Sequence, residues 1–181
     1  PKLLTLAILQ PLVDRHREEL ELNCDEAPQA ELLGRMVTGE LDLMLADAPV
    51  PANLTRGLQA LELASSGMSF MAAKAMAAKL ARNFPQSLTD APFLAGSAPG
   101  SLIGQALEAW FARHKLRPRS AGHIDDSALL DGFAQAGLGV IAVPSSIEAE
   151  VQQQYRLGVV GRTDEVRQTV YLVRARGRRA H

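Results

Sequence analysis

The spacing of apolar residues over the first fifty positions constrains the fold more strongly than any other feature of this 181-residue chain. Apolar residues recur at helical intervals from Leu3 to Val13, and they alternate with polar residues from Glu19 to Asp25 as in a half-buried strand. A second helix is predicted before Gly39, which can end it in a left-handed conformation, and Leu41 to Ala46 is an apolar run of strand length. This alternation is typical of a parallel sheet covered by helices, so the sequence predicts an α/β fold.

The rest of the chain continues the alternation, with clearer loop signals between the elements. Residues 58–73 have the pattern of two strands separated by Ser65-Ser66-Gly67, and an amphipathic helix around Trp110 follows the loop at 96–100. An apolar strand ends at Pro144. We expect further helices at residues 75–83, 127–135 and 145–154, and further strands at residues 93–95, 140–143, 157–160 and 169–174.

Composition limits the functions that are open to the chain. It is 47% hydrophobic, which is enough to bury a core, and its formal net charge is −1. A domain that grips nucleic acid itself carries a basic face that neutralises phosphates, so this balance argues against one. The single cysteine, Cys24, cannot form an internal disulfide, and its place in the alternation with Leu22 indicates a small core residue. No membrane span or secretion signal is visible, so we expect a cytoplasmic protein.

Two short segments carry a resemblance to a known family. Residues 136–144 read Ala-Gly-Leu-Gly-Val-Ile-Ala-Val-Pro, and residues 38–43 read Thr-Gly-Glu-Leu-Asp-Leu. The first resembles the AGxGxxxLP signature of LysR-type effector domains, and the second resembles the GELD turn between a helix and a strand of the same family. Residues 67–70 and 125–129 are similar to one branch, the sodium-responsive activators of sodium/proton antiporter genes.

The resemblance implies a fold with two Rossmann-like subdomains joined by two crossovers, as in type 2 periplasmic binding proteins. It places regulatory subdomain I at residues 1–70 plus 155–181 and regulatory subdomain II at 71–154. A small effector or a monovalent cation is expected in the cleft between them. The family's first strand would precede Pro1, and a winged helix-turn-helix domain, absent from this chain, would make all DNA contacts.

The implied function is that of an effector-sensing and oligomerisation domain of a transcription regulator. A homodimer or tetramer is expected, with exposed apolar residues between Leu3 and Val13 as its sign. We expect no enzyme activity, cofactor or metal site, since the sequence contains no recognisable catalytic set and its histidines lack metal-ligand spacing. The alternative left open is a periplasmic solute-binding protein of the same fold.

Candidate effector contacts lie where loops join strands to helices, since ligands of open α/β sheets bind at the carboxyl ends of strands. Ser101 and Asp126 stand just before predicted helices, where capping of the helix is the competing explanation. Asp47 ends a predicted strand, and turn chemistry explains its carboxylate less readily. The predicted effector-binding residues are Asp47, Ser66, Ser97, Gly100, Ser101, Asp125, Asp126, Ser127 and Pro144.

The charge of the effector is left open by these residues. A sodium ion prefers several oxygen ligands, which Asp47, Asp125 and Asp126 would supply as carboxylates. Helix N-termini carry partial positive charge and favour anions, so the carboxylates would have to overcome that field. The sequence is therefore compatible with a cation or with a small carboxylate.

Overall fold

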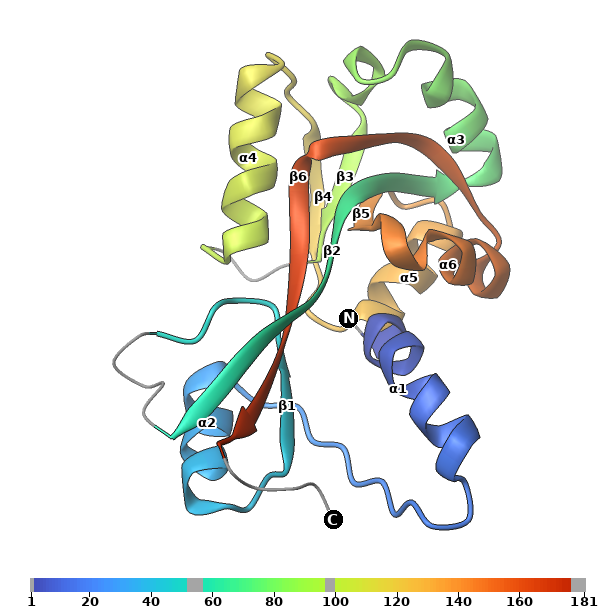
Figure 1. Ribbon diagram of the computed structural model, residues 1–181. Coiled ribbons are helices and arrows are strands. Elements are labelled where there is room, and N and C mark those ends of the chain that lie inside the picture. The colour runs from blue at the N-terminus through green and yellow to red at the C-terminus, as the bar shows by residue number, and fades with distance from the viewer. Residues whose placement is uncertain (1, 52–56, 97–99, 177–181) are drawn as a thin grey trace. The chain divides into compact units, whose positions relative to one another are not determined.

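The computed structural model describes residues 2–51, 57–96 and 100–176, and it divides the chain into two compact units. Unit 1 comprises residues 1–9 and 66–168, and unit 2 comprises residues 10–65 and 169–181. The helix α1 (Lys2–His16) and the strands β2 (Leu58–Ala73) and β6 (Leu157–Ala175) each contribute to both units (Figure 1). The subdomain boundaries inferred from the resemblance, near residues 70 and 155, stay a prediction.

Unit 2 is built around the helix α2 (Gln29–Thr38) and the strand β1 (Leu43–Ala46). Gly39 ends α2 with a φ of 80°, a left-handed conformation that glycine adopts without steric cost, which confirms the predicted helix end. The strand β1 pairs antiparallel with β6. The buried residues of this core are Leu33, Met36, Met44, Ala46, Leu58 and Val173.

The predicted strand from Glu19 to Asp25 is wrong. Residues 20–28 have no regular secondary structure, Leu22 is 48% exposed, and Cys24 is exposed rather than part of the core. The apolar alternation is real, but among the described residues no strand pairs with this segment. A strand needs a partner for its backbone groups, and sequence alternation alone does not supply one.

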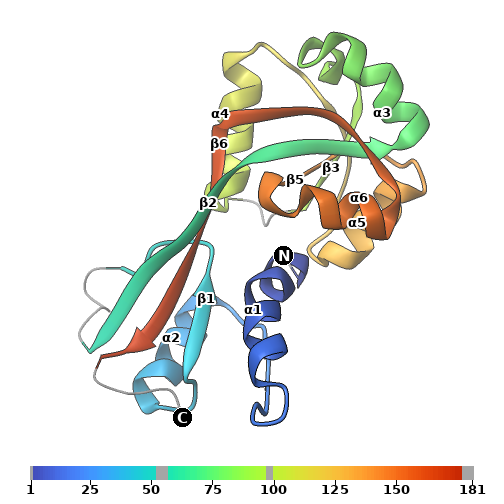
Figure 2. The ribbon, with the colours of Figure 1, turned by 45° about the vertical axis from the view of Figure 1, so that its right-hand side comes forward.

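The strands β2 and β6 are each continuous, although the sequence predicted a break in both. They are neighbours in a four-stranded sheet of order β1-β6-β2-β5, and each can be followed as one continuous strand (Figures 1 and 2). Gly67 does not break β2. A Cβ at this position would lie 2.5 Å from the backbone oxygen of Thr163, so the glycine permits a close approach to β6 instead.

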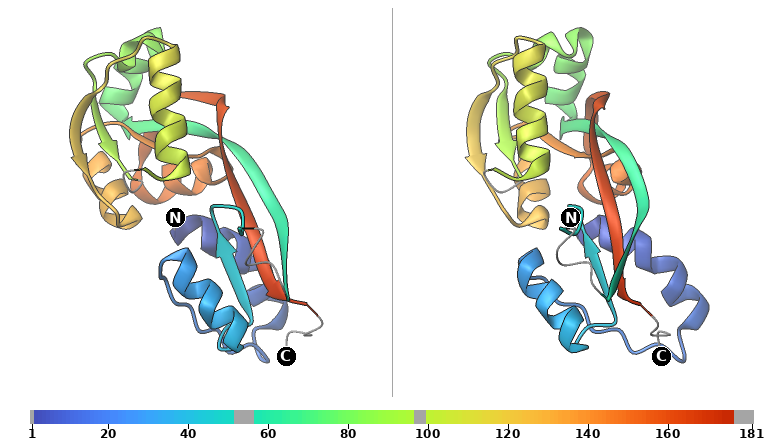
Figure 3. Two further views of the ribbon diagram at one scale, coloured as in Figure 1. Left: turned by 90° about the vertical axis from the view of Figure 1, so that its left-hand side faces the viewer. Right: turned by 60° about the vertical axis from the view of Figure 1, so that its left-hand side comes forward.

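Unit 1 carries three more strands, which are β3 (Pro92–Ala95), β4 (Arg119–His123) and β5 (Ile141–Pro144). The strands β3 and β4 form a parallel pair (Figure 3), and β5 pairs antiparallel with β2. The sequence analysis missed β4, because Arg-Ser-Ala-Gly-His has no apolar alternation. The helices of unit 1 are α3 (Lys74–Leu80), α4 (Leu102–Arg113), α5 (Ser127–Gln135) and α6 (Glu148–Tyr155), with 3-10 turns at Ala81–Asn83, Gln86–Leu88 and Ser145–Ile147.

The core of unit 1 is aromatic. Phe70 is fully buried, and its ring centroid lies 5.1 Å from that of Trp110 and 5.6 Å from that of Phe84. The rings of Phe93 and Phe111 also pack against it. Such ring pairs stabilise a core beyond the area that they bury, so the strand ends of unit 1 extend from a well-packed interior. In the described parts of the chain, no helix is long and apolar enough to cross a membrane.

Candidate functional site

The strands β3, β4 and β5 of unit 1 end at one common edge. The strands β3 and β4 are parallel, and β5 joins β3 through a parallel bridge between Phe93 and Val140. The backbone N–H of Leu94 donates to the oxygen of Val140 at 2.9 Å. Because parallel strands share direction, all three carboxyl ends lie at the same edge, which we call the carboxyl edge. Each end leads into a helix or a 3-10 turn, where free backbone N–H groups gather.

Two predicted site residues cap the helices that start at this edge. The hydroxyl of Ser101 accepts a hydrogen bond from the backbone N–H of Gly104 at 3.1 Å, and Asp126 accepts one from Leu129 at 2.9 Å. Both side chains are therefore in use as N-caps of α4 and α5. Gly100 lies in the turn before α4 with a φ of 82°. Capping leaves further lone pairs on both oxygens, so it does not preclude a ligand contact.

The start of α1 lies on the N-terminus of α5. The Lys2 ammonium pairs with the Asp126 carboxylate, and the Lys2 backbone N–H donates to the hydroxyl of Ser127 at 3.3 Å. The Lys2 hydrogen bond, followed by that from Leu129, lowers the pKa of Asp126. Asp125 is exposed and lies 3.2 Å from the Nε2 of His123. The carboxyl edge thus presents two carboxylates and a hydroxyl at a single helix start.

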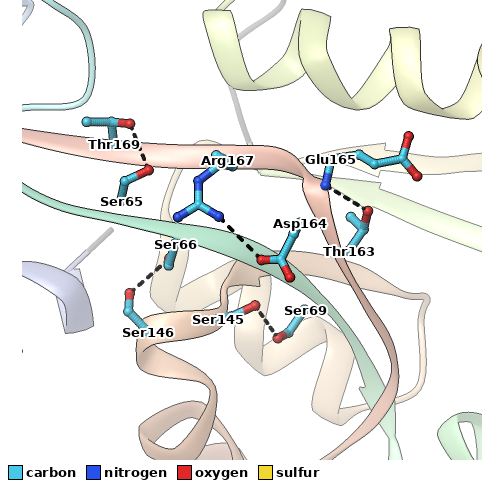
Figure 4. Close-up of polar contacts among 10 residues, drawn as sticks. All are labelled: Ser65, Ser66, Ser69, Ser145, Ser146, Thr163, Asp164, Glu165, Arg167 and Thr169. Atoms are coloured by element: carbon cyan, nitrogen blue, oxygen red, sulfur yellow. Dashed lines mark hydrogen bonds and ion pairs between the residues drawn. The ribbon is translucent and has the colours of Figure 1, made fainter.

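Four serines form a cluster where β5 meets β2. Pro144 ends β5 opposite Met68, which brings the nearby part of β2 to the carboxyl edge. The hydroxyl of Ser66 donates to that of Ser146 at 3.3 Å, and the hydroxyls of Ser69 and Ser145 lie 2.9 Å apart (Figure 4). We call Ser66, Ser69, Ser145 and Ser146 the serine cluster.

An ion pair between the exposed Arg162 and the partly buried Glu148 supports the serine cluster, and the sequence analysis missed it. Arg162 binds Glu148 with two parallel hydrogen bonds, from Nε at 2.6 Å and from Nη2 at 2.5 Å. Glu148 also accepts the hydroxyl of Ser69 at 2.6 Å. The Arg162 hydrogen bonds, together with that from Ser69, lower the pKa of Glu148 despite its burial. The segment Ser145-Ser146-Ile147-Glu148 matches the S-x-x-E pattern of a helix start, which was the available signal for Glu148.

Most of the predicted site residues are therefore brought to one edge of unit 1. These are Ser66, Gly100, Ser101, Asp125, Asp126, Ser127 and Pro144. Asp47 belongs to unit 2, where it is exposed after β1. Ser97 lies outside the described residues. Whether these residues bind an effector stays a prediction.

The glycines of residues 136–144 have structural causes that explain the signature. Gly137 has a φ of 86°, a conformation that other residues adopt with strain. A Cβ at Gly139 would lie 2.8 Å from the backbone oxygen of Pro92, so this position needs a residue without a side chain. The glycines of the signature thus allow β5 to lie close to β3. This close approach positions the end of β5 at the carboxyl edge.

This α/β architecture defines a class, the effector-binding domains with the fold of type 2 periplasmic binding proteins. The profile of the family described as the LysR substrate binding domain matches residues 2–181. The chain belongs to that family. This confirms the predicted fold class and the prediction that the chain is no enzyme, and it favours a regulator's domain over the periplasmic solute-binding protein left open above.

Solved structures of two regulatory domains and of one LysR family regulator have the same fold. The regulatory domain of HypT from Salmonella typhimurium, bromide ion-bound, is 20% identical, with 98% of this chain and 84% of that chain covered and a TM-score of 0.69. The Synechocystis CcmR regulatory domain in complex with 2-PG is 16% identical, with coverages of 99% and 85% and a TM-score of 0.64. CbnR, a LysR family transcriptional regulator, is 13% identical, with coverages of 97% and 60% and a TM-score of 0.73. No curated protein matches the chain.

Proposed function

We propose that this domain senses a small effector at the carboxyl edge of unit 1 and transmits its presence to a DNA-binding domain of the same regulator. The observation that carries the proposal is the convergence of three strand ends, two capped helix starts and the serine cluster on one edge. Such an edge is the usual ligand position in open α/β sheets. Asp47 of unit 2 is a further candidate. The predicted contacts of unit 1 are Ser66, Gly100, Ser101, Asp125, Asp126, Ser127 and Pro144.

For the effector we propose sodium or a related monovalent cation. The support is the similarity to the branch of NhaR, a sodium-responsive activator of a sodium/proton antiporter gene, together with the carboxylates of Asp125 and Asp126 at one helix start. A cation there would compete with the Lys2 ammonium for Asp126. HypT has been solved with a bromide ion and CcmR with 2-PG, so this fold accommodates more than one kind of ligand.

The signal would travel as a shift between conformations of the domain. An effector that binds one conformation more tightly raises its population and changes how paired regulator chains present their DNA-binding domains. We propose a homodimer or tetramer that uses α1, because Leu6 and Leu12 of this helix are 55% and 38% exposed. An oligomer that packs through α1 would cover these apolar side chains.

A salt titration tests the effector. We expect sodium chloride to raise the melting temperature saturably, beyond the effect of choline chloride at the same ionic strength, because a ligand that binds only the folded state stabilises it. Asp126→Asn should remove the difference between the salts. Asp90→Asn is the matched control, because Asp90 lies exposed before β3, at the opposite end of that strand, and Asn tolerates its positive φ of 61°. Identical responses of the wild-type protein to both salts would overturn direct sodium binding.

A further inference from the structure

Two residues of the serine cluster, Ser69 and Ser145, are connected to an arginine by an unbroken chain of hydrogen bonds. Arg162, on β6, grips the Glu148 carboxylate, which accepts Ser69, and the hydroxyl of Ser69 lies against that of Ser145. Ser69 is fully buried, and the Glu148 side chain is only 13% exposed. Water therefore has little access to Ser69 and Glu148 in the middle of this hydrogen-bond chain. Other groups of the protein must satisfy their hydrogen-bonding capacity.

The number of protons that each group can donate determines which group donates and which accepts along this hydrogen-bond chain. An arginine only donates, and an ionised carboxylate only accepts. Ser69 has one hydroxyl proton, and Glu148 takes it at 2.6 Å. Ser69 must then act as the acceptor toward Ser145, so the proton of Ser145 is the one between these two oxygens. Ser145 is left with lone pairs and no free proton.

Ser146, which follows Ser145, has a hydroxyl that can donate. Ser146 is exposed and accepts the proton of Ser66 at 3.3 Å, so its own hydroxyl proton is available. The two adjacent hydroxyls at the carboxyl edge thus differ, although the sequence reads simply as a pair of serines. The difference originates at Glu148, which lies three residues after Ser145 in the sequence.

We propose that the chain from Arg162 through Glu148 and Ser69 makes Ser145 an acceptor-only contact, so that it takes the positively charged or N–H-bearing part of an effector. This rests on the proposed function, since it presumes that the effector binds at the carboxyl edge. Ser69, Glu148 and Arg162 are positioning residues that set the polarity of Ser145 without touching the effector. A carboxylate or halide would find no donor on the hydroxyl of Ser145.

The test compares three salts on the isotope-labelled chain by recording the backbone amide signals of residues 145 and 146. Ammonium chloride supplies an N–H donor, choline formate supplies a carboxylate, and choline chloride is the background at equal ionic strength. At residue 145 we expect a saturable shift with ammonium and none with formate, whereas the available proton of Ser146 permits a formate response at residue 146. In Ser69→Ala the proton of Ser145 loses its acceptor and can point outward, so ammonium should bind about fivefold to tenfold more weakly and formate should gain a response.

Ser65→Ala is the matched control, because Ser65 lies on the same strand and its hydroxyl accepts a hydrogen bond from Thr169 at 3.2 Å in unit 2. A purely structural loss would not invert the preference between the two salts. If Ser69→Ala does not fold, the preference of the wild-type protein for ammonium over formate at residue 145 still tests whether Ser145 acts only as an acceptor.

Two outcomes would overturn the inference. One is a wild-type response to formate at residue 145, and the other is a lack of any response to ammonium there. Amide shifts around Ser101 and Asp126 in the same spectra report on the proposed function separately. A saturable response there, with none at residue 145, would leave an effector at the carboxyl edge while removing the polarity of Ser145.

Discussion

Unit 1 and unit 2 bury very different interiors. Around Phe70, unit 1 packs the rings of Phe84, Phe93, Trp110 and Phe111. Over the residues that the structure describes, the core of unit 2 consists of leucine, methionine, alanine and valine, and Tyr171 is the one partly buried aromatic residue that packs against it. In β2 the contrast appears within one strand, since residues 60–64 are exposed and residues 67–72 are buried. The two units are thus unequal in the packing that holds their loops in place.

The difference explains where the candidate site lies. A binding site needs side chains that stay in place, and the loops of the carboxyl edge leave strands that are anchored in the aromatic core. Most of the predicted contacts belong to unit 1, whereas Asp47 stands alone in unit 2. We therefore expect unit 1 to supply most of the recognition and unit 2 to respond to it.

Removing the central ring should have the largest effect. Phe70→Ala leaves a cavity among four other rings, so we expect a loss of about 3–5 kcal/mol in the free energy of unfolding. Urea unfolding followed by the fluorescence of Trp110, the sole tryptophan, measures this in unit 1. Met44→Ala in the core of unit 2 is the counterpart, and it should displace the Trp110 transition less than the circular dichroism transition. Equal displacement of both would mean that the two cores unfold as one.

Two glycine substitutions compare how tightly the backbone is packed in unit 1 and in unit 2. Gly139→Ala forces a methyl group toward the oxygen of Pro92, so it should cost about 1–3 kcal/mol and disturb the approach of β5 to β3. Gly34→Ala, in α2 of unit 2, meets nothing within 4 Å and should stabilise the protein by about 0.5–1 kcal/mol. Thermal unfolding of the pair measures both. A neutral Gly139→Ala would contradict the tight packing that we assign to the signature.

Local patterns in the sequence predicted much of this architecture. The helix α5 begins at Ser127 and ends at Gln135 as expected, and α2 ends at Gly39. The carboxyl edge was found because polar loop residues that follow apolar strands are recognisable without a partner strand. Local propensity and capping chemistry agree at these positions, and agreement between levels is what makes a prediction reliable.

Features that depend on distant partners were not predictable in this way. The continuity of β2 through Gly67 depends on β6, about a hundred residues away in sequence, and the Glu148–Arg162 pair joins a helix to a strand. Proton direction along the serine cluster follows only once that pair is known. The strand β4 shows no apolar alternation, and its parallel partner β3 stabilises it as a strand.

A buried carboxyl of unit 1 gives a pH-dependent prediction. Asp131, on α5, is 5% exposed, and burial raises its pKa from 3.8 to about 6. The folded state therefore holds this proton more tightly than the unfolded state, so stability is present below pH 4 and is lost as the pH rises through 6. Asp131→Asn, which stays neutral, should stabilise the protein at pH 7.5 on the order of 1 kcal/mol, since water near the carboxyl reduces the full effect.

Urea unfolding of Asp131→Asn and the wild-type protein at pH 4 and at pH 7.5 measures this gain. The benefit should shrink toward zero at the lower pH, where the wild-type carboxyl is protonated in both states. An equal benefit at both values would show that the substitution acts through packing and not through charge.

Cys24 should give the smallest effect, and it tests the segment of unit 2 without regular secondary structure at residues 20–28. Because its side chain is exposed in a segment without regular structure, Cys24→Ser should change the free energy of unfolding by less than about 0.5 kcal/mol. A thiol reagent should modify Cys24 rapidly in the folded chain. Slow modification would contradict the exposure of Cys24 and would mean that this segment is covered, either by another chain or within its own chain. Dilution would restore rapid modification in the first case only, which distinguishes pairing between chains from burial within one.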